Sequence, residues 1–280
     1  MKYGIALGSC NAKFFGDVTL EAEALGYESV WLPEHLIFTT KMTRSPRPGE
    51  THPPVPPTTP IFDAFAYLSY LAGRTEHIRL GTHVYNIGLR HPFVTARAVQ
   101  TLDIVSGGRF EFGIGASWLE EEWIVTELDF ASRGRRVDEC VEVCKKLWTE
   151  EEVSYHGEFF DFDGAVFLPK PVQSPWPPIL VGGESAAALK RAARLGDGWI
   201  GMNHNFESGA AAIRRLQQHL EECGRDPSDF QICLGAAVTS RQDRDRWEEL
   251  GVTRMVFAPW TSSREAIDGM RRFAGEIGLD

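Results

Sequence analysis

Short apolar runs alternate with segments whose apolar residues recur at helical spacing along the whole chain. Glycine, proline and serine residues mark many of the boundaries between them. We expect strands over Tyr3–Gly8, Ser29–Leu32, Ile78–Tyr85, Arg109–Ile114, Ile179–Val181, Trp199–Met202, Ile232–Val238 and Arg254–Phe257. We expect helices over Phe15–Leu25, Ile61–Ala72, Pro92–Val105, Arg136–Trp148, Ser185–Leu195, Gly209–Cys223, Asp243–Leu250 and Arg264–Ile277, and a small hairpin over Val153–Phe162 turning near His156–Gly157.

Strand–helix units in this succession predict a parallel sheet, and their number and size match a closed (β/α)8 TIM barrel. A doubly wound open sheet is the alternative with the same alternation. Composition does not shift along the chain, so we expect a single domain over residues 1–280. Seven of the 16 prolines fall within residues 38–60, which predicts a long loop after the second strand. In a barrel, that loop lies on the face where active sites are built.

Charge and cysteine usage exclude several classes of protein. The chain is 43% hydrophobic and 24% charged, as in ordinary globular proteins, and its formal net charge is −10. This acidity argues against a nucleic acid or an anionic membrane as the main partner. The five cysteines are widely spaced and form no Cys-x-x-Cys, which argues against a disulfide framework. Leu7–Cys10 is interpreted as part of the first strand rather than a lipoprotein cleavage box, and we expect a cytoplasmic protein.

Three familiar motifs are absent or misplaced. Gly196–Gly201 matches G-x-G-x-x-G, but it follows a helix and leads into a strand, the reverse of a dinucleotide site. The eight histidines show no H-x-H or H-E-x-x-H spacing, so no metal is expected. There is no G-x-S-x-G elbow, which argues against a serine hydrolase.

Two positions at predicted strand ends carry candidate chemistry. Glu34 and His35 follow the second strand, where a histidine can move a proton and a neighbouring carboxylate can orient or charge it; a solvated loop pair is the alternative. Gly182 and Gly183 end a later strand, and Ser185 is a good N-cap for the next helix. The free amides there either hold a phosphate or simply form a tight turn.

Other polar and aromatic residues on this face are less decisive. Arg90 either balances an anionic ligand or pairs with a carboxylate, and His83, taken alone, is typical of a core histidine. Trp118 either forms a floor for a planar ligand or packs in the core. The acidic run Glu120–Glu122 is interpreted as a solvated helix start that complements the helix dipole.

Four stretches together resemble the bacterial luciferase-like flavin and deazaflavin oxidoreductases. They are Ser29–His35; Leu80–Thr82 with Arg90–Pro92; Thr101–Arg109 with Gly113–Trp118; and Pro177–Gly183 with Leu195–Trp199. They occur in the family's order and cover essentially the whole chain. The carboxylate–histidine pair is most similar to the branch that uses the deazaflavin coenzyme F420.

The resemblance implies a TIM barrel that holds a tricyclic ring edge-on at its C-terminal mouth. It implies that His35 donates or accepts a proton beside the ring, with Glu34 next to it, and that a non-proline cis peptide joins His83 to Val84. The cofactor contacts it implies are Thr82, His83, Val84, Gly115 and Trp118 near the ring, and Gly182, Gly183, Gly201 and Met202 at the phosphate.

Two positions depart from the family's pattern. His83 is bulkier than the small residue expected at the cis bond. Trp118 stands where some deazaflavin dehydrogenases place a catalytic glutamate, so the resemblance does not extend to sugar-phosphate dehydrogenation.

The leading hypothesis is an F420-dependent oxidoreductase that transfers a hydride to or from an unidentified small organic substrate. The alternative within the family is an FMN-dependent monooxygenase that uses O2 and reduced flavin from a partner reductase. A cofactor-free barrel lyase or hydrolase and a non-catalytic flavin-binding protein stay open as other classes. The resemblance also implies a homodimer.

Overall fold

The parallel strands close into a barrel. The computed structural model describes residues 1–46, 55–236, 238 and 240–279. Within these residues one sheet runs in the order β3-β2-β1-β11-β10-β9-β8-β5-β4, and β3 also pairs with β5, which closes the ring. The predicted barrel is confirmed and the open sheet is excluded. Its strands are β1 (Lys2–Ala6), β2 (Ser29–Leu32), β3 (Arg79–Thr82), β4 (Tyr85–Asn86), β5 (Phe110–Gly115), β8 (Ile179–Gly182), β9 (Gly198–His204), β10 (Gln231–Ala236) and β11 (Arg254–Phe257).

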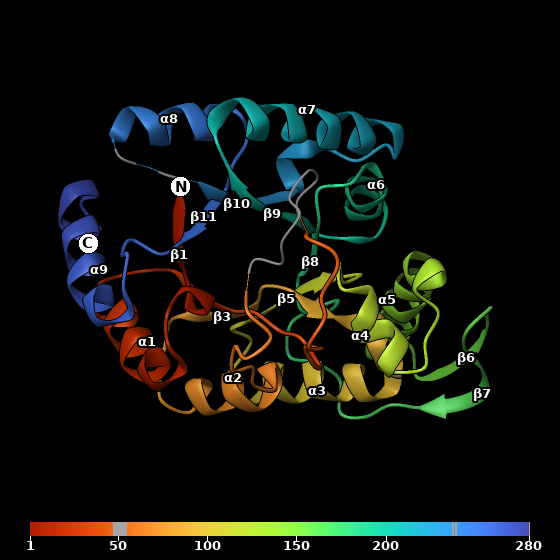
Figure 1. Cartoon of the computed structure of the whole chain (residues 1–280). Helices are drawn as coiled ribbons and strands as arrows, with labels where there is room; N and C mark the ends of the chain where they lie inside the picture. The colour runs from red at the N-terminus through yellow and green to blue at the C-terminus, as the bar shows by residue number, and fades with distance from the viewer. Residues whose placement is uncertain (47–54, 237, 239, 280) are drawn as a thin grey trace.

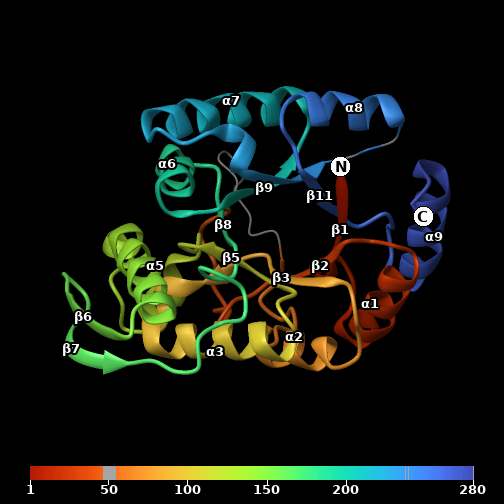
Figure 2. The same cartoon turned by 180° about the vertical axis from the view of Figure 1, so that it is seen from behind.

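Helices surround the barrel on its outer side (Figure 1). They are α1 (Phe15–Ala24), α2 (Ala64–Ala72), α3 (Pro92–Val105), α4 (Glu120–Val125), α5 (Arg133–Thr149), α6 (Ala186–Leu195), α7 (Phe206–Glu222), α8 (Arg241–Glu249) and α9 (Ala266–Ile277). The antiparallel hairpin of β6 (Glu152–His156) and β7 (Asp161–Val166) projects at one edge, beside α5 and α3 (Figure 2). In the described part of the chain, no helix combines the length and apolar character needed to cross a bilayer.

The observed elements differ from the predicted ones mainly at strand ends. The predicted strand Ile78–Tyr85 is divided into β3 and β4, and the first strand stops at Ala6, after which Leu7–Ser9 form a 3-10 turn. Helix α2 starts at Ala64 because the Asp63 side chain caps it. Helix α4 begins at Glu120, where the acidic run is interpreted as a helix start, but its extent over only six residues was not predicted. Of the predicted loop over residues 38–60, residues 47–54 lie outside the described residues.

The middle of the barrel is filled by apolar side chains. Trp31 of β2 is fully buried there, and a Cβ atom on Gly81 of the neighbouring strand would overlap its indole ring. This close approach explains why β3 carries a glycine at that point. The other buried members of this cluster are Leu180, Ile200, Cys233 and Val256.

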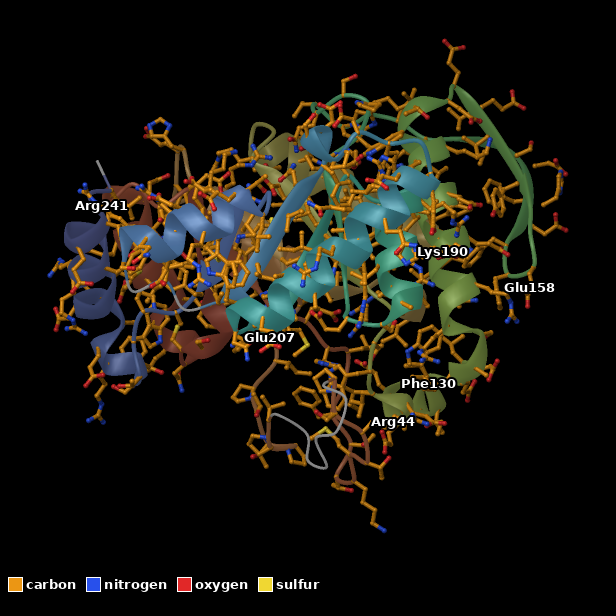
Figure 3. The ribbon with its side chains drawn as sticks, turned by 90° about the horizontal axis from the view of Figure 1, so that it is seen from above. Arg44, Phe130, Glu158, Lys190, Glu207 and Arg241 are labelled. Carbon is orange, nitrogen blue, oxygen red and sulfur yellow. The ribbon has the colours of Figure 1, made fainter. Side chains whose placement is uncertain are left out.

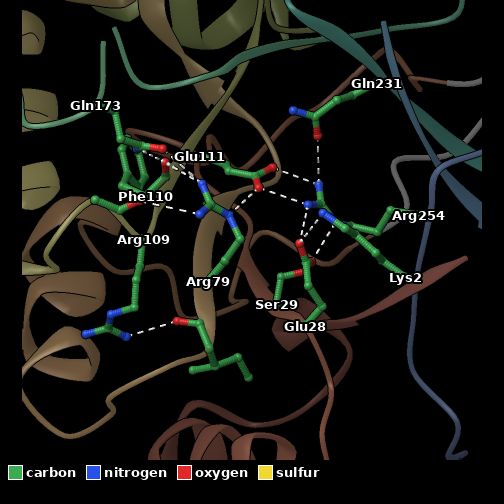
Figure 4. A network of polar contacts seen from close by, with 12 residues as sticks. Lys2, Glu28, Ser29, Arg79, Arg109, Phe110, Glu111, Gln173, Gln231 and Arg254 are labelled. Atoms are coloured by element: carbon green, nitrogen blue, oxygen red, sulfur yellow. Dashed lines mark hydrogen bonds and ion pairs between the residues drawn. The ribbon is translucent and has the colours of Figure 1, made fainter. Parts of the chain in front are cut away.

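The N-terminal end of the barrel is filled by ion pairs (Figure 4). The Arg254 guanidinium lies 2.6 Å from a Glu28 oxygen and 2.7 Å from a Glu111 oxygen. Arg79 also pairs with Glu111, at 2.5 Å. Since Arg254 and Glu111 are both almost fully buried, this end is occupied by protein, and a ligand site belongs at the opposite mouth.

Candidate active site at the C-terminal mouth

His35, just after β2, is held by a buried carboxylate. Its Nδ1 atom lies 3.1 Å from Oε2 of Glu122, in the first turn of α4. An ionised carboxylate only accepts hydrogen bonds, so this contact assigns the proton to Nδ1. No described residue bonds to Nε2, which leaves that nitrogen as the one able to exchange a proton with a ligand.

Glu122 is an organising centre of the mouth. Its side chain is fully buried and also accepts hydrogen bonds from Leu36 N at 2.5 Å, Ile37 N at 3.3 Å and Ser117 Oγ at 3.1 Å. The interpretation of Glu120–Glu122 as a solvated helix start is therefore wrong for Glu122. Leu119, Glu122 and Trp123 are all fully buried at i, i+3 and i+4, and that spacing was the signal available in the sequence.

The two preceding glutamates of the acidic run hold the loop that follows His35. The Arg44 guanidinium lies 2.5 Å from Glu120, and Glu121 accepts hydrogen bonds from the Thr43 amide at 2.9 Å and hydroxyl at 2.6 Å. Arg44 also lies over the ring of Phe130, as the view from above shows (Figure 3). Together with Glu122, the acidic run anchors the start of the predicted long loop to α4.

Glu34 does not contact His35. Its carboxylate, almost fully buried, pairs with Arg90 at 2.6 Å and accepts a hydrogen bond from Asn86 N at 3.0 Å. Burial opposes a charge on Arg90, but the attraction of Glu34 outweighs it and raises the pKa of Arg90. Neighbouring side chains on extended backbone point to opposite sides, so the carboxylate that orients His35 is Glu122, and the predicted role for Glu34 is corrected. The carboxylate partner considered for Arg90 is found, but it is buried.

The predicted cis peptide between His83 and Val84 is present and separates β3 from β4. The Val84 side chain occupies the space beside two predicted cofactor residues. A Cβ on Gly115 would lie 2.6 Å from Val84 Cγ2, and one on Gly182 would lie 2.8 Å from Val84 Cγ1. These glycines are therefore explained by packing against Val84. Thr82 is fully buried, and its hydroxyl donates a hydrogen bond to the backbone oxygen of Gly113 at 2.7 Å.

Aromatic rings surround His35 at the mouth. Trp118 meets its imidazole edge to face at a centroid distance of 5.5 Å, and Phe38 lies at 4.8 Å. His83 follows β3 and is partly exposed. Desolvation of its ring lowers the pKa of His83 to about 4, so the imidazole is neutral at neutral pH. Among the described residues, the mouth therefore offers aromatic rings and, at Nε2 of His35, a histidine nitrogen without a described partner, which suits a planar ligand.

The predicted phosphate loop has the expected backbone but an unexpected occupant. Gly183 has φ +114°, which favours glycine, and the Ser185 side chain caps α6 by accepting from Ala188 N. The Glu184 carboxylate accepts a hydrogen bond from Met202 N at 2.7 Å and contacts His204 Nε2 at 3.0 Å. Neither Glu184 nor His204 is among the residues predicted for this site.

Gly201 does not open toward this loop. A Cβ there would meet Trp199 and Leu234 at 2.6 and 2.7 Å, so this glycine too is explained by packing inside the barrel. The G-x-G-x-x-G match at Gly196–Gly201 follows a helix and leads into a strand, as predicted, since α6 ends at Leu195 and β9 starts at Gly198.

The donors and rings at the mouth fit a planar cofactor with an anionic tail. Met202 N–H and His204 contact an acidic group of the protein itself, the Glu184 carboxylate. His35, Trp118 and Phe38 supply the ring contacts. The described residues contain no group of three His, Cys, Asp or Glu side chains arranged to hold a metal ion.

A separate groove of about 700 Å³ lies on the outer side of the barrel. It lies between α2, α3 and β7, and Phe65, Phe93 and Val166 are among its lining residues. None of the predicted site residues lines it, so it is not the candidate active site.

Comparison with known proteins identifies the family of the chain. The family model of luciferase-like monooxygenases matches residues 3–278. Uncharacterized protein Rv0940c of Mycobacterium tuberculosis is 30% identical over 258 residues, which is 91% of this chain and 88% of that protein. An F420-dependent glucose-6-phosphate dehydrogenase of Kineococcus radiotolerans is 31% identical over 278 residues, which is 94% of this chain and 76% of that protein.

A solved structure gives the same architecture. The coenzyme F420-dependent tetrahydromethanopterin reductase of Methanopyrus kandleri superposes with a TM-score of 0.79 at 16% identity, covering 98% of this chain and 97% of that one. At this identity the likeness establishes the fold alone.

Proposed function

Because the chain belongs to the luciferase-like monooxygenase family, we propose that this oxidoreductase transfers a hydride between coenzyme F420 and a small organic substrate. The observation that carries the proposal is His35, with Nδ1 held by Glu122 and Nε2 free among aromatic rings at the mouth. The F420-dependent relatives support the choice of cofactor. Family membership does not favour the cofactor-free lyase or hydrolase.

The residues of the chain would bind the cofactor, orient the substrate and carry the proton. Bound F420 would supply the ring carbon that accepts or donates the hydride. A hydride leaving a carbon that bears a hydroxyl leaves a proton to be removed, and Nε2 of His35 is placed to accept it or, in reverse, return it. Trp118 and Phe38 would shield this exchange from water, and the donors around Glu184 would hold the phosphate.

Cofactor titration tests the proposal directly. When F420 is titrated with the purified protein, its fluorescence is expected to change until binding is saturated. FMN is expected to bind weakly in the same experiment. A screen of small alcohols and carbonyl compounds, followed by the visible absorbance of F420, then identifies the substrate class. Tight FMN binding without F420 binding would falsify the choice of cofactor.

The FMN-dependent monooxygenase remains the second candidate, since the family is described as luciferase-like monooxygenases. Oxygen consumption in the presence of reduced FMN and a flavin reductase distinguishes it from a dehydrogenase. A homodimer and a cytoplasmic location stay predictions.

Glu122 is proposed as a positioning residue for His35. In Glu122→Gln, an NH2 group replaces one of the two carboxylate oxygens that His35 Nδ1 and Leu36 N contact. This loss of an acceptor is expected to lower kcat about 10- to 100-fold. Glutamine keeps only one acceptor oxygen and carries no negative charge, so the Nδ1 proton of His35 loses its carboxylate partner, and the pH profile of kcat is expected to shift as well. The measurement is steady-state hydride transfer across pH.

The matched control is Glu120→Gln in the same helical turn, where the carboxylate pairs with Arg44 and does not contact His35. It is expected to keep the wild-type pH profile. Equal pH profiles for Glu122→Gln and the wild type would remove Glu122 from the positioning of His35.

A further inference from the structure

The Glu184 carboxylate bridges the ends of two strands. Glu184 follows β8, and both of its partners belong to the neighbouring strand β9: the Met202 amide at 2.7 Å and His204 Nε2 at 3.0 Å. The two side chains are mostly buried, with 15% of Glu184 and 12% of His204 exposed. On its other side, His204 Nδ1 lies 3.0 Å from Ser208 Oγ, which fixes the orientation of the ring.

These partners form a donor pair for an anion. The contact with an ionised carboxylate requires that Nε2 of His204 carries a proton, since a carboxylate only accepts. Two N–H groups from one strand end therefore converge on one carboxylate. The start of α6 follows directly after Ser185, and its positive end adds to the attraction for negative charge.

A phosphate cannot share this donor pair with the carboxylate. The oxygens of a phosphate group would need the same two N–H donors that the carboxylate uses, and two anions this close repel each other in a site with little water. The carboxylate has to leave the pair before a phosphate can take it. Glu184 is the residue of the loop whose position makes it a competitor.

We propose that Glu184 is an internal competitor for the cofactor's phosphate and so sets the affinity of this site for a phosphate-bearing tail. In this view Met202 N–H and His204 bind the phosphate once the Glu184 side chain moves away. Glu184 therefore weakens the binding of phosphate-bearing cofactors relative to the binding of their phosphate-free chromophores. The inference rests on the proposed function, because that function supplies the flavin-type ligand.

The test compares ligands that differ at the phosphate. Dissociation constants are measured by fluorescence titration for FMN against riboflavin and for F420 against its phosphate-free deazaflavin chromophore. Glu184→Ala is expected to tighten the phosphate-bearing member about tenfold or more and to leave the phosphate-free member unchanged. Adding His204→Ala to Glu184→Ala is expected to reverse most of that gain.

Glu207→Gln is the control for net charge. Glu207 is exposed at the start of α7, and its replacement removes the same negative charge as Glu184→Ala. It is expected to change neither member of a pair. Thermal melts confirm that each variant is folded.

Four outcomes overturn the proposal. An equal change for both members of a pair makes Glu184 a bridge between strands only. Weaker binding of the phosphate-bearing member makes it a contact of the cofactor. If the wild type binds no flavin or deazaflavin, with or without phosphate, the proposed function itself is wrong and this inference falls with it. If the wild type binds these chromophores but Glu184→Ala does not change the affinity for the phosphate-bearing member, the inference alone is rejected.

Discussion

Replacement of His35 by alanine is expected to lower hydride transfer by about 100- to 10,000-fold while cofactor binding is retained, because the proton at the reacting group loses its carrier. In the structure His35 is the residue at the mouth whose orientation is set by a buried carboxylate and whose second nitrogen has no described partner. The measurement is single-turnover reduction or oxidation of bound F420, together with its dissociation constant.

His35→Asn sharpens this test. Its side-chain amide keeps a hydrogen-bond donor near Glu122 but has no atom equivalent to Nε2. A variant that holds the loop in place yet loses turnover like alanine assigns the effect to Nε2. Unchanged turnover in either variant would remove His35 from the mechanism, whereas equal losses in binding and turnover would make it a cofactor contact.

Replacement of Arg254 by methionine is expected to lower the free energy of unfolding by about 3–5 kcal/mol, because the buried Glu111 and the partly buried Glu28 lose the guanidinium that they share. Arg254 is 1% exposed and pairs with Glu28 and Glu111 at the closed end of the barrel. Urea denaturation at neutral pH measures the change. Arg271→Met, which breaks the pair of an exposed arginine with Glu21, is the control and is expected to have little effect.

The loss on replacing Arg254 is also expected to depend on pH. Burial raises the pKa of Glu28, but hydrogen bonds and attraction from Arg254 outweigh it, so the pKa of this carboxyl is lowered in the folded protein. Such a group stabilises the fold above the unfolded pKa and stops doing so as pH falls through the folded one. Without Arg254, burial favours the neutral acid, so the difference from the wild type shrinks toward about pH 4. A destabilisation that is constant from pH 7 to about pH 4 would contradict this assignment.

Periodicity and strand-end chemistry predicted most of the architecture. The alternation of apolar runs and amphipathic segments was enough for the barrel, because each βα unit carries its own signal. The N-cap at Ser185 follows from local chemistry in the same way. The cis bond at His83–Val84 came from family resemblance, since no local rule favours it outside proline.

The sequence by itself determined the order of the elements, the end of the barrel that carries the site, and His35 as the residue able to move a proton. Only the tertiary structure decided the partners: Glu122 for His35 across 87 residues, Arg90 for Glu34 across 56, and Met202 for Glu184 across 18. The physical reason is that periodicity reports which face of its own element a side chain occupies. Which carboxylate meets which donor depends on how separate strand ends are brought together, and a shift of one residue, as between Glu34 and His35, exchanges the buried side chain for the one at the mouth.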